Sequence, residues 1–244
     1  MSAYAESMSY GVMTPVAAPP NVRTEFLKKV AVKVLGSLAI TAVASVVWMA
    51  AIATVQVLTQ QWIALGIMLG GIYGAQFIGN RMTASPDATT RIAGFVAGSV
   101  MQGMALAYIL GAAALMSASV LGSPLTLIGQ AGGLVFLTVL GMVAYLWSGP
   151  EDLSLLRSAL SVLFLPMLGL MAIGFFFPVG GTLGLVFAAF FVVVSAGALL
   201  YSLNTVMHRM SVHESTAGAF YISTSIVVLF WNVLSLLMRL TSRR

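Results

Sequence analysis

The feature that most constrains this chain is a series of long apolar runs that carry no charged residue. The first extends from Val34 to Leu58, and at about 1.5 Å per residue of helix it exceeds the roughly 30 Å hydrocarbon core of a bilayer. Six further runs cover residues 62–79, 92–116, 125–146, 157–177, 182–206 and 217–238. The alternating pattern of a β-barrel is absent, so only helices satisfy the backbone in lipid. The sequence predicts an all-α integral membrane protein, a seven-transmembrane-helix bundle.

Composition excludes several other classes of protein. Of the 244 residues 60% are hydrophobic and only 7% are charged, whereas about a quarter of a soluble domain is charged. The chain has no cysteine, which excludes disulfide scaffolds, zinc–thiolate sites and thiol nucleophiles. The net charge of +5 comes from basic residues at the ends of apolar runs rather than in one patch, so we expect no nucleic-acid partner.

Ionisable side chains are missing at membrane depth. No Asp, Glu, Lys, Arg or His lies within 34–80, 92–150, 158–207 or 215–238. Proton relays and voltage sensors depend on such groups, and an intramembrane enzyme needs a nucleophile with a nearby base or metal. We therefore expect no enzyme activity, no catalytic residue, no metal and no cofactor.

The distribution of basic residues predicts the orientation in the membrane. The N-terminal flank and the even-numbered loops hold eight Lys or Arg residues and the odd-numbered loops hold none, which places the N-terminus in the cytoplasm and the chain in the cell (inner) membrane. Residues 1–24 are Pro-containing and read as a flexible cytoplasmic tail, with the membrane domain over 25–244. A full seventh crossing would put Arg239, Arg243 and Arg244 outside. Either that segment is re-entrant, or the charge bias is overridden.

Amides and hydroxyls are the polar groups that remain inside the runs. The candidates for an ion path or for helix packing are Gln102, Ser202, Asn204, Ser225 and Asn232. Such groups line a water-filled path in some bundles, but more commonly they hydrogen bond across helices. A loop with His208, His213 and Glu214 is either a pH sensor or an ordinary solvated loop, and we favour the latter.

Glycines at a spacing of four allow helix backbones to approach closely, and we interpret them as ordinary packing. They are Gly66/Gly70/Gly74, Gly94/Gly98 and Gly129/Gly133.

Several short motifs in a fixed order resemble one membrane-protein family. They are Phe26-Leu27-Lys28-Lys29-Val30, Gln102-Gly103-Met104-Ala105-Leu106, Ala144-Tyr145-Leu146-Trp147-Ser148, Asp152-Leu153-Ser154, Leu200-Tyr201-Ser202-Leu203-Asn204 and Leu229-Phe230-Trp231-Asn232-Val233-Leu234. Together they are similar to the Bax inhibitor-1 family, also called the transmembrane Bax-inhibitor-motif family, over Phe26 to Leu240.

The resemblance implies a seven-helix bundle whose last helix is central. It also implies a stress-protective role and, as in several members, a calcium leak controlled by two intramembrane aspartates. Those aspartates would fall at Ser202 and Ser225, and a third-helix glutamate at Gln102. Serine and glutamine neither titrate nor carry charge.

A bacterial branch that similarly lacks the aspartates resembles this chain at His213-Glu214-Ser215. Its enterobacterial member modulates FtsH, a membrane-anchored protease, through a cytosolic N-terminal tail. Two functions therefore stay open: a weak cation leak with calcium as the permeant ion, and a regulatory interaction with a membrane protease complex.

Overall fold

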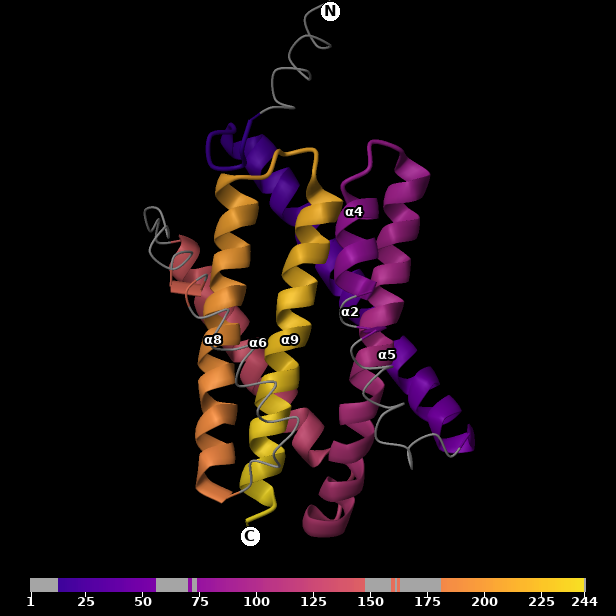
Figure 1. Cartoon of the computed structure of the whole chain (residues 1–244). Coiled ribbons are helices and arrows are strands. Elements are labelled where there is room, and N and C mark those ends of the chain that lie inside the picture. The colour runs from indigo at the N-terminus through magenta and orange to yellow at the C-terminus, as the bar shows by residue number, and fades with distance from the viewer. Residues whose placement is uncertain are drawn as a thin grey trace, which may run out of the picture. The chain divides into compact units, whose positions relative to one another are not determined.

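The computed structural model describes residues 13–55, 70–71, 74–147, 159–160, 162 and 181–243, and within these ranges it contains helices and turns but no strand (Figure 1). The elements are α2 (Pro20–Val55), the π-helix η2 (Ala75–Gly79), α4 (Asn80–Thr83), α5 (Ala88–Leu121), α6 (Thr126–Trp147), α8 (Gly181–His208) and α9 (Ser215–Thr241). Five of them, α2, α5, α6, α8 and α9, are long and apolar enough to cross a membrane. The predicted all-α membrane fold is confirmed.

The five long helices correspond to five of the seven predicted crossings. The predicted run 157–177 lies outside the described residues except at 159–160 and 162, and the run 62–79 is described only at 70–71 and 74–79. Helices α2, α5, α8 and α9 begin before the apolar runs that predicted them. In particular, α2 begins at Pro20 instead of Val34 and so starts inside the range assigned to the tail. Proline is favoured at the first helical position, and long basic side chains let a helix continue into the polar boundary of the bilayer.

Two alternatives were open for the last apolar run, a full crossing or a re-entrant segment, and the structure of helix α9 bears on them. It is one continuous helix from Ser215 to Thr241, about 40 Å long at 1.5 Å per residue. A re-entrant segment would need a break in this helix to turn back, and the described backbone shows none. The re-entrant alternative therefore has no support.

The chain divides into two compact units. Unit 1 comprises Met1–Ala112 and Thr205–Val227, and unit 2 comprises Ala113–Asn204 and Val228–Arg244. The divisions fall inside α5, α8 and α9, so each of these helices contributes one part to each unit.

In unit 1, α2, α5 and α9 all begin at the same end (Figure 1). Phe220 of α9 is a fully buried aromatic ring that packs into a hollow made by two glycines. A Cβ added at Gly98 of α5 would lie 2.6 Å from the Phe220 ring, and one added at Gly79 would also collide with it. Phe95 contacts the ring edge to face at 6.4 Å between centroids. Close approach of three elements at this point thus requires glycine.

Only some of the glycines that were predicted to allow close helix packing lie in close contacts. Gly74 and Gly94 lie against Met101 and Met82, and Gly98 lies against Phe220, so close packing is confirmed at these three positions. No described atom lies within 4 Å of a Cβ added at Gly70, Gly129 or Gly133. Gly66 lies outside the described residues.

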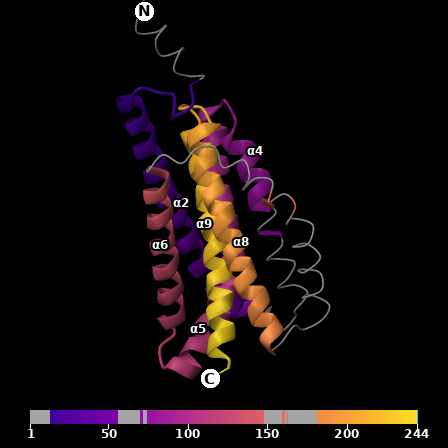
Figure 2. The same cartoon turned by 90° about the vertical axis from the view of Figure 1, so that its left-hand side faces the viewer.

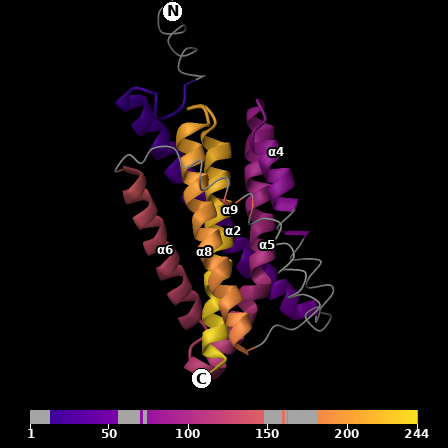
Figure 3. The ribbon, with the colours of Figure 1, turned by 60° about the vertical axis from the view of Figure 1, so that its left-hand side comes forward.

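Unit 2 contains α6, an unbroken helix in Figure 2, which a short turn joins to the end of α5 (Figure 3). Gly122 in this turn has a φ of 73°, a conformation that costs a glycine little. The buried Ser117 hydroxyl donates to the Ser123 carbonyl at 2.5 Å and accepts the Leu127 amide at 3.3 Å. One side chain therefore holds the turn and the start of α6. Exposed Phe136 and Leu137 on α6 suit contact with lipid.

Candidate functional site

A line of polar side chains runs along one face of α2 in unit 1. Its members, Lys33, Ser37, Thr41 and Ser45, recur every four residues, and that spacing keeps them on one helical face. The three hydroxyl residues are 0%, 2% and 1% exposed. Together with their partners on α5 and α9 we call this line the polar seam.

The middle of the polar seam is a cluster of three serine hydroxyls from three helices. Ser37 Oγ lies 2.7 Å from Ser99 Oγ on α5 and donates to Ser223 Oγ on α9 at 2.9 Å. Ser99 also donates to the Phe95 carbonyl at 2.8 Å, and Ser223 donates to the Phe220 carbonyl at 2.9 Å. These four contacts share three hydroxyl hydrogens, because each serine has only one to donate. The cluster is therefore rich in acceptor oxygen and carries no charge.

One end of the polar seam holds its only ionised member. Lys33 Nζ donates to Ser215 Oγ at 2.8 Å and to Thr216 Oγ1 at 2.7 Å. Both hydroxyls belong to the first turn of α9 and both residues are buried. The ammonium thus ties α2 to the start of α9 and places a fixed positive charge at this end of the seam.

Gln102 of α5 makes a further side-chain bond to α9. It is 3% exposed, and its Nε2 donates to Thr224 Oγ1 on α9 at 2.6 Å. Thr224 donates in turn to the Phe220 carbonyl at 2.8 Å. The Gln102 Oε1 atom is buried and accepts no hydrogen bond from the described residues. A buried amide oxygen without a donor suits a water molecule or a weakly bound cation.

The other predicted polar residues divide between the two units. Ser225 belongs to unit 1 with Gln102, whereas Ser202, Asn204 and Asn232 belong to unit 2. Ser225 donates to the Tyr221 carbonyl at 3.1 Å and Ser202 donates to the Ala198 carbonyl at 2.8 Å. Ser202 and Ser225 are the positions at which the family resemblance implies aspartates, and each of their hydroxyls donates to a carbonyl of its own helix.

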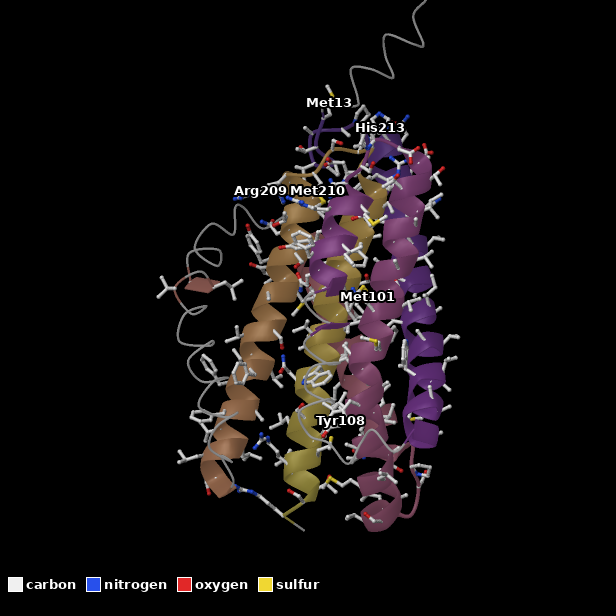
Figure 4. The ribbon with its side chains drawn as sticks, turned by 45° about the vertical axis from the view of Figure 1, so that its right-hand side comes forward. Met13, Met101, Tyr108, Arg209, Met210 and His213 are labelled. Atoms are coloured by element: carbon white, nitrogen blue, oxygen red, sulfur yellow. The ribbon has the colours of Figure 1, made fainter. Side chains whose placement is uncertain are left out.

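The loop between α8 and α9 is bonded to the segment before α2. The Val16 amide donates to the Met207 carbonyl at 3.3 Å, and the Val212 amide donates to the Met13 carbonyl at 3.2 Å. We call residues 13–19 and 207–214, joined in this way, the clasp. Figure 4 shows Met13, Arg209, Met210 and His213 gathered at this end of unit 1, whereas Met101 and Tyr108 lie further along α5.

The predicted pH-sensing residues all lie in or beside the clasp. Glu214 Oε2 accepts the Ser211 amide at 2.9 Å, which stabilises the turn before α9, and His208 and His213 are exposed. Nothing in these contacts assigns a sensing role, which stays a prediction. Within the described ranges no three His, Asp or Glu side chains are grouped so that they could hold a metal ion.

A distinct electrostatic feature lies at the start of α5. The Asp87 carboxylate accepts the Thr90 hydroxyl at 2.6 Å and the Thr90 amide at 2.7 Å. These hydrogen bonds, the side-chain bond first, hold the pKa of Asp87 below its ordinary value. Asp87 therefore acts as the N-terminal cap of α5.

The polar seam itself was not predicted from the sequence, although a signal for it was present. The four-residue spacing of Lys33, Ser37, Thr41 and Ser45 is visible in the chain. The sequence does not single it out, because Lys33 lies before the apolar run that begins at Val34 and small hydroxyls are common in membrane helices.

A known protein family matches most of the chain. The chain matches the family described as "Inhibitor of apoptosis-promoting Bax1" over residues 23–242, a range that includes every long helix except the first residues of α2. No curated protein and no solved structure matches the chain. The family match covers nearly the whole chain, and the chain therefore belongs to the Bax inhibitor-1 family.

Proposed function

We propose that this protein is a regulatory interaction protein of the cell membrane, without enzymatic activity, that engages a membrane-anchored protease such as FtsH. The clasp is the observation that carries the proposal. It joins the segment before α2 to the α8–α9 loop through two backbone hydrogen bonds. Val16 and Arg209, one from each of the two joined parts, are both exposed. A partner that recognises the N-terminal segment therefore contacts the loop before α9 as well.

The polar groups of the membrane domain support the same choice. Calcium conduction favours carboxylates, because a divalent cation must recover the energy of its lost hydration. Here the corresponding positions are hydroxyls, and those of Ser202 and Ser225 each donate to a backbone carbonyl. In addition, the ammonium of Lys33 lies at one end of the polar seam and repels cations.

The interaction is tested by reconstituting the protein with purified FtsH in one bilayer and measuring co-capture and the degradation rate of a reporter substrate. Two truncations separate the parts of the N-terminus. Deletion of residues 1–12 leaves the clasp intact, and deletion of residues 1–19 removes its N-terminal half. We expect the second deletion to lose both capture and the effect on degradation. Equal capture by the full chain and the 1–19 deletion would refute the proposal.

A weak cation leak with a stress-protective role is the second candidate. The buried Oε1 of Gln102, which no described donor satisfies, favours a hydrated position within the bundle. In this case calcium is the permeant ion, and Ser202→Asp combined with Ser225→Asp should raise the flux and make it pH-dependent. Unchanged flux in that double variant would count against a leak.

The proposed topology has seven crossings, a central last helix and a cytoplasmic N-terminus. Support comes from unit 1, where α2, α5 and α9 begin at one end. The first part of α2 contains Arg23, Lys28 and Lys29, and the first turn of α5 contains Arg91. Because the chain has no cysteine, single cysteines can be introduced and labelled with a membrane-impermeant maleimide. We expect Ser123→Cys to react in intact cells and Ser85→Cys to react only after the membrane is permeabilised. The reverse pattern would invert the topology.

A further inference from the structure

A methionine side chain of the clasp packs against the first turn of α9. A Cβ added at Gly218 would lie 3.4 Å from the Met210 Sδ atom and 3.1 Å from the Val206 Cγ1 atom. Gly218 is a buried residue of α9, so the thioether of Met210 lies where this glycine leaves room for it. All three residues belong to unit 1. The loop between α8 and α9 is therefore held to α9 by this sulfur contact.

A water-soluble reagent can reach this methionine. Met210 is half-buried and lies in the loop between α8 and α9, outside the apolar runs. Figure 4 shows it at the clasp end of unit 1, together with the exposed Arg209 and His213. The Met101 Sδ atom lies similarly, 3.5 Å from a Cβ added at Gly74, but Met101 belongs to an apolar run of α5. The two methionines thus share a packing mode and differ in their access to water.

The thioether of methionine accepts an oxygen atom from a peroxide. A sulfur lone pair attacks one oxygen of hydrogen peroxide, the O–O bond breaks, an S–O bond forms, and the second oxygen leaves as water. Sulfur is oxidised by two electrons and the peroxide is reduced by two. The product, methionine sulfoxide, is polar, and methionine sulfoxide reductases return it to methionine.

A sulfoxide at Met210 does not suit the place of the thioether. The methyl groups of Val206, which line the hollow at Gly218, offer no hydrogen-bond donor. The Gly218 amide already donates to the Glu214 carbonyl at 2.9 Å. Because a polar oxygen without a donor is costly to bury, the oxidised side chain turns toward water and the loop loses its packing on α9.

We propose that Met210 is a site of reversible oxidation by hydrogen peroxide, and that its sulfoxide releases the α8–α9 loop from the start of α9. The clasp includes this loop, so the bond from the Val212 amide to the Met13 carbonyl, 3.2 Å long, is weakened as well. The proposal does not depend on the protease interaction.

The test exposes the purified full chain in liposomes to hydrogen peroxide and follows each methionine by peptide mass spectrometry. We expect Met210 to be oxidised at least about tenfold faster than Met101, because oxidation follows exposure. Hydrogen–deuterium exchange of the Val212 and Gly218 amides should then rise by about fivefold to 100-fold, the range that corresponds to one polar group buried without a partner. Treatment with methionine sulfoxide reductases should restore the original exchange rates.

Two leucine variants form the matched pair, because leucine keeps the size and apolar character of methionine. Met210→Leu should abolish the response of hydrogen exchange to peroxide, and Met101→Leu should retain it. Met210→Gln, which places a polar amide at the same position, should raise the exchange rates without peroxide.

Three results would overturn the proposal. The first is oxidation of Met210 at the same rate as Met101. The second is unchanged exchange of the Val212 and Gly218 amides once Met210 is oxidised. The third is a full response to peroxide in Met210→Leu, which would assign the effect to another methionine.

Discussion

Replacement of Gly98 by alanine tests the packing that holds α9 in unit 1. The new methyl carbon would lie 2.6 Å from Cε2 and Cζ of Phe220 and 3.2 Å from the Gly79 Cα. Carbon atoms in favourable contact are about 3.5–4.0 Å apart, so the ring must withdraw by about 1 Å. Phe220 is 0% exposed, and Phe95 contacts it from another direction. Overpacking of this kind costs about 1–3 kcal/mol.

The measurement is reversible unfolding in mixed detergent micelles, in which rising sodium dodecyl sulfate is monitored by tryptophan fluorescence. A double-mutant cycle identifies the contact. Phe220→Ala alone should cost about 3–5 kcal/mol, and in that background the Gly98 methyl group meets the space that the ring has left. We therefore expect a favourable coupling of about 1–3 kcal/mol between the two substitutions.

A matched glycine serves as the control for helix propensity. Gly36 on α2 has no described atom within 4 Å of an added Cβ, so Gly36→Ala should be neutral or stabilising by up to about 1 kcal/mol. Equal stabilities of the Gly98→Ala and Gly36→Ala proteins, or strict additivity of Gly98→Ala with Phe220→Ala, would refute the packing of the Phe220 ring against Gly98.

Three smaller changes follow from individual hydrogen bonds, and each is measured by the same unfolding assay. Ser37→Ala should lower the free energy of unfolding by only about 0.6 kcal/mol, typical of one interhelical bond in a membrane protein. The cost is small because the hydroxyls of its partners Ser99 and Ser223 still donate to carbonyls. A cost above about 3 kcal/mol would show instead that the seam holds the helices together. Ser117→Ala should cost about 1–3 kcal/mol, since it leaves the buried Leu127 amide without its acceptor, and an unchanged stability would contradict this role. Asp87 has a lowered pKa in the folded protein, so its capping contribution to stability is present above the ordinary pKa of 3.8 and is lost as the pH falls below that value. Asp87→Asn should remove this part of the pH dependence of stability. An identical pH profile of stability in the variant would argue against the cap.

Much of the helical architecture was predictable because it depends on local properties of the chain. Long uncharged runs have only one way to satisfy their backbone in lipid, and five of them correspond to long helices. The start of α2 was less predictable, since hydropathy marks the lipid-embedded part of a helix and not its hydrogen-bonded end. Pro20 begins the helix well before the apolar residues do.

The candidate site was predicted only in part, for a physical reason. Gln102 was singled out as a polar residue at membrane depth, and it is buried and bonded to Thr224. The hydroxyls of Ser37 and Ser223, in contrast, form a site only because they are in contact with each other, although 186 residues separate them in the sequence. A spacing along one helix predicts a face, but the identity of the facing helix depends on tertiary packing. The same holds for the hollow at Gly98, which a distant phenylalanine fills.

The most direct test of the account is calcium flux through the purified protein in dye-loaded liposomes between about pH 6 and 8, the range in which histidines titrate. Circular dichroism of the same sample establishes that the protein is folded. We predict no calcium entry above that of empty liposomes for the wild-type protein, because its seam offers hydroxyls and one ammonium group where a calcium path needs carboxylates. Calcium entry that rises with protein content and changes with pH would contradict the account and favour a leak.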